Sequence, residues 1–372
     1  FRHFPPLRKI SFCSLSLSPV LSRAMTTMEQ RRNQNTVQQQ DDEETQHGPF
    51  PVEQLQAAGM ASVDVKKLGD ARLWHLSWKS LRNLSLIECK LGQESTDNIL
   101  SGCPVLESLT LYACRSLERL DLRKSLSLRR LEIYHSHPGR ELDPSGPVEI
   151  VAPHIHFLKL TVYADKQFTL TDVSSLTEAH LYIRINILLD STAHCFQTLA
   201  LELLAKLHNV ESLTLGATLL RILSLAELRG DPFPTLKVQT LIIRTETEFA
   251  QSVPGIARLL QNSPGLKKLT VYMMHGYNIM SRNLDQYWGL KYKVFAPSND
   301  SYSMLGCNVA TSKVLAWFME LVLRNAKTLE NMVVWLRSRY FDDAQWFEEQ
   351  LQIVGTLSHN NNVSILLKRK NF

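Results

Sequence analysis

The sequence contains little glycine and none of the glycine-based motifs that mark common catalytic sites. Glycine accounts for 15 of the 372 residues. The phosphate-binding pattern G-x-x-x-x-G-K-S/T, the dinucleotide pattern G-x-G-x-x-G and the hydrolase pattern G-x-S-x-G are all absent. Basic or polar residues also interrupt every apolar segment before it reaches the ~18 residues of a membrane-spanning helix. We therefore expect neither an enzyme nor a membrane partner.

Cysteine and net charge are scarce as well. No two of the six cysteines have the C-x₂₋₄-C spacing of a zinc site, and six thiols scattered over 372 residues do not form a disulfide framework. Free thiols favour a reducing compartment, the cytoplasm or the nucleus. The net charge of +5, from 41 basic and 36 acidic residues, gives no reason to expect nucleic acid as a partner. The cysteines are Cys13, Cys89, Cys103, Cys114, Cys195 and Cys307.

Two histidine pairs and one acidic run are the remaining candidates for metal or catalytic chemistry. On strands, His135 with His137 and His154 with His156 would each share a face, but neither pair has a carboxylate or thiol beside it at ligand spacing. The acidic run at 41–44 lies in a segment without a scaffold, and catalysis needs groups that are held in place. We predict no catalytic residue, no metal ligand and no cofactor.

The N-terminal segment differs in composition from the rest of the chain. Residues 1–28 contain no acid and several serines and cations, which resembles a transit peptide. Alternatively they are the end of a truncated upstream segment, or untranslated sequence read in frame before Met25. Residues 29–48 have almost no apolar side chains and cannot offset the entropy of ordering. We expect 1–48 to be disordered or non-native and 49–73 to be a linker or N-terminal cap.

From about Trp74 a pattern recurs in which leucine, two residues, leucine, one residue and leucine follow one another. Eight copies occur, and seven spacings separate their last apolar residues. These spacings run from 22 residues (Leu111 to Ile133) to 32 residues (Ile183 to Leu215). Six of the seven fall within the ~20–29 residues of leucine-rich repeats. The clearest copies end at Leu86, Leu111 and Ile133, and weaker ones at Leu160, Ile183, Leu215, Ile243 and Val271.

The alternation of leucine with polar residues places the leucines on one face of a strand. One such unit cannot bury its leucines alone, whereas units stacked in parallel form a continuous core. We therefore predict an α/β fold, a leucine-rich-repeat solenoid over 74–372 with a curved parallel sheet on its concave face. Helices and loops should cover the convex face. Residues 276–310 interrupt the pattern as an insertion, and a C-terminal capping region follows.

The segments between the strands carry helix signals, so strand and helix should alternate. Ser95 and Thr96 are N-cap candidates for a helix that stops at Gly102. Ser252 should start another, and a longer one should end near Asn325. Further helical spacing covers 196–207 and 344–354.

Several stretches resemble the repeat domain of plant F-box/leucine-rich-repeat proteins. They are Trp78 to Leu86, Ser101 to Leu111 and Pro147 to Ile155, and the stretch Arg324 to Val334 resembles the C-terminal region that many of these proteins share. The resemblance covers roughly 74–372. It implies a protein–protein interaction scaffold, the substrate-recognition domain of an SCF-type ubiquitin ligase.

The sequence departs from that family in one place. An F-box opens with a Leu-Pro-x-x-Leu-like signature, and residues 1–73 contain nothing of that kind; Pro51 to Leu55 is the nearest stretch. We expect the SCF adaptor to be a partner only if the full-length protein carries an F-box, and this chain by itself not to bind it. The alternative is a stand-alone repeat protein in signalling or immunity with no ligase role.

The outward face of the strands is the expected binding surface. Strand alternation exposes the residues that flank each leucine, and cations and tyrosines dominate among them. Arginine and tyrosine are prominent in interface energetics, so the partner is expected to be a protein substrate with an acidic or phosphorylated segment. Tyr112, Arg130, Tyr134, Tyr182 and Arg184 should form its centre. The full candidate set is Tyr112, Arg130, Tyr134, Lys159, Tyr182, Arg184, Arg244, Lys268 and Tyr272.

Overall fold

A computed structural model describes the repeat region in eight stretches. The chain divides into two compact units, Phe1–Pro51 and Val52–Phe372, and every described residue belongs to the second. The predictions for 1–48, for most of 49–73 and for most of the insertion at 276–310 lie outside the described residues, and a helix begins at Cys307, within the predicted insertion. The described stretches are 62–66, 78–135, 147–163, 168–184, 190–246, 252–274, 307–337 and 344–370.

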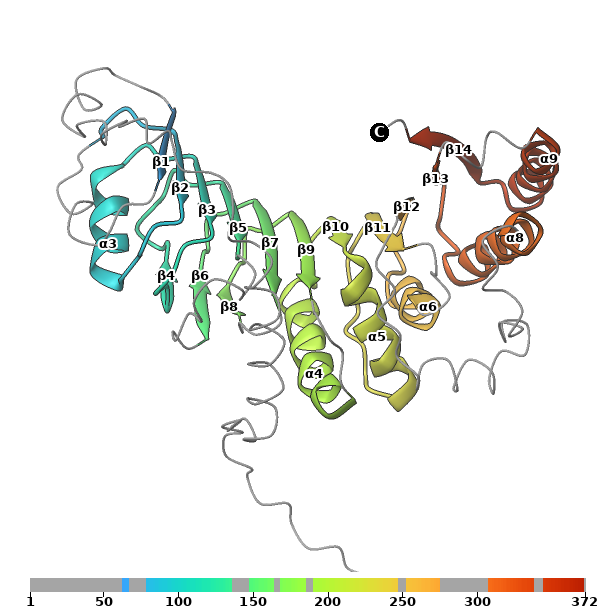
Figure 1. The fold of residues 1–372 in the computed structure, drawn as a ribbon, viewed down its shortest axis with the longest axis horizontal. Helices are drawn as coiled ribbons and strands as arrows, with labels where there is room; N and C mark the ends of the chain where they lie inside the picture. Colours follow the sequence, from blue (N-terminus) through green and yellow to red (C-terminus); the bar gives the residue numbers. More distant parts are fainter. Residues whose placement is uncertain are drawn as a thin grey trace, which may run out of the picture. The chain divides into compact units, whose positions relative to one another are not determined.

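Within the described stretches the main sheet has eleven strands, and all of them run parallel in sequence order. In Figure 1 the strands follow one another along an arc, with α4, α5 and α6 on its outer side. The predicted parallel sheet is therefore confirmed. The strands are β1 (Ser62–Lys66), β2 (Asn83–Ile87), β3 (Ser108–Tyr112), β5 (Arg130–Tyr134), β7 (Phe157–Tyr163), β9 (Glu178–Arg184), β10 (Ser212–Leu215), β11 (Thr240–Glu246), β12 (Lys268–Met274), β13 (Asn331–Arg337) and β14 (Ser364–Lys370).

The alternating leucines form the core, as the pattern predicts. Leu86, Leu111 and Ile133 lie side by side in register on β2, β3 and β5, and each is at most 4% exposed. Leu160 continues the row on β7. The leucines of each strand thus pack against those of the neighbouring repeats, which is the packing of a solenoid.

The outer side differs from the predicted alternation of strand and helix. Between β3 and β9 it carries a second parallel sheet, in the order β4–β6–β8, so the expectation of helices there is wrong. Apolar residues such as Val148, Ile150 and Val151 dominate β6 and are buried, and β-branched side chains favour strands over helices. The three strands are β4 (Arg119–Asp121), β6 (Val148–Val151) and β8 (Phe168–Asp172).

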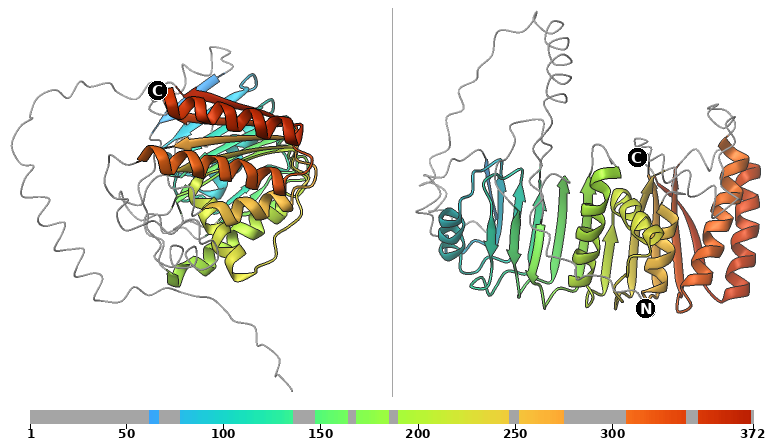
Figure 2. Two further views of the ribbon diagram at one scale, coloured as in Figure 1. Left: turned by 90° about the vertical axis from the view of Figure 1, so that its right-hand side faces the viewer. Right: turned by 90° about the horizontal axis from the view of Figure 1, so that it is seen from below.

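Six helices among the described residues complete the outer side. They are α3 (Gln93–Gly102), α4 (Asp190–Lys206), α5 (Ala217–Arg229), α6 (Val253–Gln261), α8 (Cys307–Asn325) and α9 (Ala344–Asn361). Figure 2 shows α3 at one end of the row of strands and α8 and α9 at the other.

Of the two predicted helix starts, the first is displaced and the second agrees with the structure. Gly92, rather than Ser95 or Thr96, is the N-cap of α3, and both of those side chains are buried in the first turn. The Thr96 hydroxyl donates to the Gly92 carbonyl at 3.0 Å. Ser252 does precede α6, although its side chain makes no capping hydrogen bond, and α8 ends at Asn325 as expected.

Two of the cysteines lie just after strands β2 and β3. Cys89 and Cys114 each follow a residue with positive φ, 54° at Glu88 and 52° at Ala113, where the chain turns out of its strand. The Cys114 thiol donates to the Leu86 carbonyl of the preceding repeat at 3.2 Å. Contact with Cys89 and burial raise the pKa of Cys114, so its thiol stays protonated. These cysteines are therefore structural, and the described residues contain no cluster of three metal-ligand side chains.

Within the described part of the chain, no helix has the length and apolar character needed to cross a membrane.

Candidate interaction face

The side of the main sheet that faces away from the helices and the second sheet is here called the open face. Its side chains form three rows, because residues in register on neighbouring strands lie side by side. On β5, Arg130 lies in the first row, Glu132 in the second and Tyr134 in the third. The third row is the richest in large side chains. It contains Lys66, Ile87, Tyr112, Tyr134, Thr161, Tyr182, Gly216 (which directly follows β10), Arg244, Tyr272, Trp335 and Lys368.

A hydrogen-bonded cluster around Glu132 occupies the open face at β5 and β7. The Arg130 guanidinium donates to the Glu132 carboxylate at 2.8 Å, and the Tyr134 hydroxyl donates to its other oxygen at 2.6 Å. Lys159 Nζ lies 3.8 Å from the same carboxylate. Arg130 also packs 3.6 Å above the centre of the Phe157 ring. The two cations of this cluster thus already have a carboxylate partner.

The surroundings of Glu132 favour its charged form. Burial by itself would raise the pKa of Glu132, but hydrogen bonds from Tyr134 and Arg130 and the charges of Arg130 and Lys159 hold that pKa below its usual 4.5. Burial and the bond to Glu132 in turn raise the pKa of Tyr134. The cluster is therefore a fixed ion pair with a neutral tyrosine at neutral pH.

We predict that Glu132→Gln lowers the free energy of unfolding at pH 7 by about 1–2 kcal/mol, because a hydrogen bond to a charged group is lost. A depressed carboxyl pKa contributes stability that is complete above its unfolded value and lost as pH falls through the folded value. The difference between parent and Glu132→Gln should therefore shrink below about pH 4.5. Urea unfolding at pH 7 and pH 3.5 measures it, with the exposed Glu348→Gln as control. A difference that does not change with pH would contradict the prediction.

A histidine and a glutamate continue the open face on β9. His180 Nε2 lies 2.7 Å from a Glu178 carboxylate oxygen, and the His180 ring meets the Phe157 ring edge-on at 4.9 Å. Burial and the charges of Lys159 and Arg244, which outweigh the opposing effect of Glu178, hold the pKa of His180 below its usual value. His180 is thus neutral at pH 7 and lies in the positive field of two cations from different strands.

From β9 to β14 the third row becomes a continuous ladder of aromatic and cationic side chains. The Arg244 guanidinium lies 5.4 Å from the Tyr182 ring centre and 5.3 Å from the Tyr272 ring centre. The Tyr272 and Trp335 rings are stacked at 5.7 Å with 9° between their planes. Lys368 Nζ lies 5.4 Å above the Trp335 ring. Each member of the ladder thus contacts the next one.

Gly216 allows the ladder to continue across β10. A Cβ at this position would lie 3.1 Å from Tyr182 Cδ1, so the ring of Tyr182 leans over the space that a side chain would occupy. Arg244 and Tyr182 lie on strands that are not neighbours, with β10 between them. Without a side chain at Gly216, the two groups meet across that strand.

The structure places seven of the nine predicted site residues in two groups. Tyr112 is 50% exposed, and its ring lies 5.8 Å from that of Tyr134, so the expected neighbours on β3 and β5 do meet. Arg130 and Lys159 belong with them in the Glu132 cluster. Tyr182, Arg244 and Tyr272 belong to the ladder, and Lys268 lies in the first row of β12.

Arg184 differs in register from the other residues predicted for the centre of the site. Arg184 pairs in register with Tyr163, whereas Tyr182 pairs with Thr161 in the third row, so Arg184 lies one row further along the strand. The copy that ends at Ile183, the fifth of the eight, is offset because Ala179 stands where the neighbouring repeats have leucine. The shift also concealed Glu178, a second acid in the first row opposite Phe157.

The sequence prediction also omitted Trp335 and Lys368. The signal was present, since both strands were recognised as repeats, and aligning them with the preceding copies places both residues in the third row.

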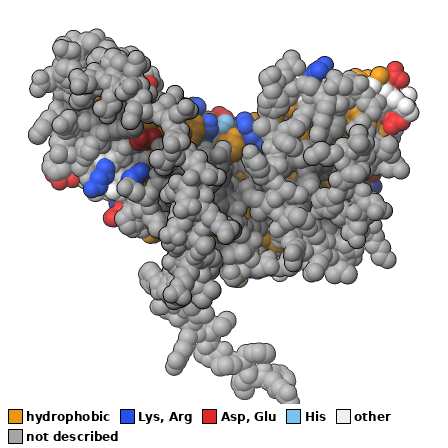
Figure 3. Space-filling view, in the orientation of Figure 1, with side chains coloured by type: hydrophobic (Ala, Val, Ile, Leu, Met, Phe, Trp, Pro, Cys, Tyr) orange, Lys and Arg blue, Asp and Glu red, His pale blue; other side chains and the backbone are white. Residues whose placement is uncertain are grey.

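Figure 3 shows blue, pale-blue and orange side chains next to one another above the middle strands, where the open face lies.

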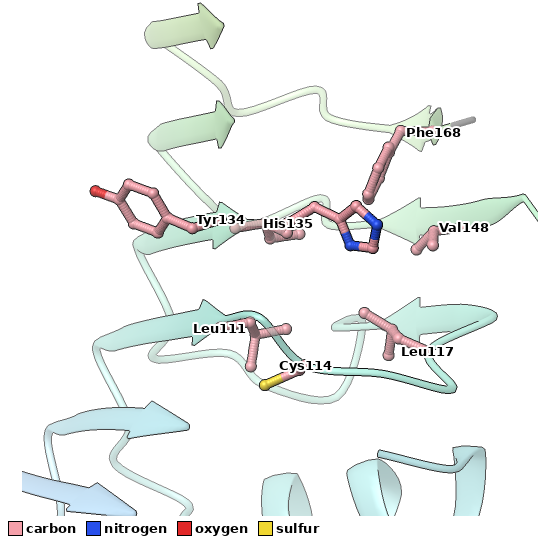
Figure 4. Close-up of a pocket in the computed structure, with 8 residues that line it drawn as sticks. Leu111, Cys114, Leu117, Tyr134, His135, Val148 and Phe168 are labelled. Carbon is pink, nitrogen blue, oxygen red and sulfur yellow. The ribbon is translucent and has the colours of Figure 1, made fainter. Parts of the chain in front are cut away.

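A small space between the two sheets does not offer a second site. It is about 10 Å³, which fits about one water molecule. Figure 4 shows the His135 ring pointing toward Phe168, while the neighbouring Tyr134 points to the opposite side. The lining residues are Leu111, Cys114, Leu117, Ile133, Tyr134, His135, Val148 and Phe168.

The sequence of this chain is similar to those of plant repeat proteins. A family model described as the LRR repeats of the FBD-associated F-box protein At5g56370 matches residues 37–144. Two Arabidopsis thaliana proteins named as F-box/LRR-repeat proteins, At5g02700 and At3g28410, are each 60% identical over 299 and 307 residues respectively. The matches cover 80% of this chain but only 64% of each relative.

A third Arabidopsis thaliana relative is covered almost completely. At1g60180, named as an F-box protein, is 43% identical over 307 residues, which make up 78% of this chain and 88% of the relative. The leucine-rich-repeat solenoid that the sequence predicts is confirmed by the family model and by the parallel sheet.

Proposed function

Because this chain belongs to the plant F-box/LRR-repeat protein family, we propose that it is the substrate-recognition part of an SCF-type ubiquitin ligase. A repeat-based interaction scaffold is the function that the family supports directly. Since the chain spans 64% of the length of its first relatives, the ligase role is inferred for the whole protein. We also propose that the protein acts in the cytoplasm or the nucleus.

The observation that carries the proposal is the open face. Large aromatic and cationic side chains line it over neighbouring strands, and such side chains are enriched where proteins bind tightly. The small space between the sheets offers no room for a substrate of an enzyme. The nine residues predicted from the sequence remain the proposed contact set, with Arg184 in the neighbouring row.

The test is an immunoprecipitation of the gene product, tagged at its own locus in the plant. We expect the SCF adaptor and a cullin to co-purify, together with proteins that accumulate when the proteasome is inhibited. Co-purified partners without adaptor or cullin would contradict the ligase role and support a stand-alone repeat scaffold in signalling or immunity. A tagged, unrelated repeat protein in the same tissue serves as the control.

A further inference from the structure

We propose that the ladder of Tyr182, Arg244, Tyr272, Trp335 and Lys368 binds an extended acidic segment of the partner protein. The proposal rests on the proposed function and specifies the chemistry of the partner. It moves the centre of the binding surface from β3–β9, where the sequence placed it, to β9–β14.

The first argument is that the open-face cations on β11, β12 and β14 have no acidic partner among the described residues. Among the described residues, Arg244, Lys268 and Lys368 have no carboxylate within ion-pair distance, whereas Arg130 and Lys159 both pair with Glu132. In all three rows of the open face from β10 to β14 there is no acid. This half of the face therefore has the positive charge that an anionic partner would neutralise.

The second argument is that the cations are already held in position. Arg244 lies between two tyrosine rings, and Lys368 lies over Trp335. A guanidinium stacked on aromatic rings keeps its N–H groups free at the edge, where they donate to carboxylates. Side chains that are fixed before binding lose less entropy when the partner arrives.

The ring contacts favour a peptide over a nucleic acid. Single-stranded nucleic acids bind by stacking their bases on open aromatic faces. Here Tyr272 and Trp335 stack on each other, and Arg244 and Lys368 cover their remaining sides. The ladder therefore presents ring edges and charged groups, which suit carboxylates and aliphatic side chains.

The spacing of the ladder predicts a motif in the partner. Arg244 on β11 and Lys368 on β14 are separated by three strand spacings, or about 14 Å at ~4.8 Å each. An extended chain advances ~3.3 Å per residue, and its side chains i, i+2 and i+4 share one face. Two acids four residues apart would therefore meet Arg244 and Lys368, with an apolar side chain between them over Tyr272 and Trp335.

Gly216 is a positioning residue for this ladder. A side chain there would displace the Tyr182 ring, since its Cβ alone would approach to 3.1 Å. Gly216 is also the N-cap of α5, with φ −82° and ψ 160°, a conformation open to any residue. Gly216→Thr would introduce a side chain that is well tolerated at an N-cap and would fill the space beneath Tyr182, which separates an effect on binding from an effect on folding.

The experiment is a selection of random twelve-residue peptides displayed on phage against the full chain. The enriched peptides are then synthesised with a fluorescent label, and their affinities are measured by anisotropy. The variants are Arg244→Gln, Lys368→Gln and Gly216→Thr. Lys327→Gln is the matched control, because Lys327 is an exposed cation in the turn between α8 and β13. Thermal melts confirm that each variant remains folded.

We expect enrichment of two acids four residues apart around an apolar residue. Arg244→Gln should weaken binding by about 10-fold or more, in keeping with hot-spot losses. Gly216→Thr should weaken it measurably, and Lys327→Gln should leave it unchanged. No enriched peptide, peptides without acids, affinities insensitive to Arg244→Gln, or stronger binding of single-stranded oligouridylate would each overturn the proposal. Failure of this selection leaves adaptor and cullin co-purification unaffected, so the two proposals fail separately.

Discussion

Replacing Leu111 with Asp is expected to lower the free energy of unfolding by about 4 kcal/mol or more. Leu111 lies on β3 and is 2% exposed, between Leu86 and Ile133 on the neighbouring strands. Truncating a buried leucine alone costs about 2–5 kcal/mol, and an unpaired carboxylate in an apolar core adds its desolvation. The change is measured by urea unfolding followed by circular dichroism.

Ser108→Asp is the matched control for Leu111→Asp. Ser108 lies on the same strand, but its side chain is on the open face and in register with Arg130. The same new charge should change stability there by less than about 1 kcal/mol. If the two substitutions had equal effects, the assignment of inner and outer faces on β3 would be wrong.

Position 111 also shows why so much of the fold was predictable. A strand whose leucines alternate with polar residues has one buried face, and a one-residue slip would expose every leucine. The clear copies at Leu86, Leu111 and Ile133 therefore fixed both the strands and their register. Where one leucine is replaced by Ala179, that constraint weakens. The pattern ends this copy at Ile183, whereas Leu181 is the residue in register with Leu160.

Other features depended on contacts between segments far apart in the sequence. The strands β4, β6 and β8 are short, three to five residues each. A segment of that length is stable only as part of a sheet. The recurring leucine spacing predicts one strand for each repeat and therefore does not predict a second strand on the outer side. The first strand, β1, also depends on pairing, because its only partner among the described strands is β2.

The candidate site shows the same limit for charges. The binding face predicted from the sequence contains five cations, and strand alternation gives no reason to distinguish among them. They are Arg130, Lys159, Arg184, Arg244 and Lys268. In the structure, Glu132 pairs with Arg130 and Lys159, while Arg244 lies between aromatic rings. Which cation pairs with which acid depends on side-chain geometry across strands, and strand alternation alone does not determine it.

The packing of α5 against α6 leads to the second large expected effect. Gly255 on α6 faces the backbone of α5, and a Cβ there would lie 2.7 Å from both the Leu220 carbonyl oxygen and the Ser224 nitrogen. The Gly255 N–H donates to the Ser224 hydroxyl at 2.9 Å, which draws the helices together. Because the contacted atoms are backbone, they cannot move aside as a flexible side chain would.

We therefore expect Gly255→Val to lower the free energy of unfolding by about 3 kcal/mol, the upper range for overpacking a tight contact. Gly355→Ala is the control, because Gly355 also lies in a helix, α9, but nothing lies within 4 Å of its added Cβ. Alanine there should raise stability by about 0.5–1 kcal/mol through helix propensity. Both changes are measured by urea unfolding at pH 7. If Gly255→Val were as stable as the parent, α5 and α6 would not approach each other at this glycine.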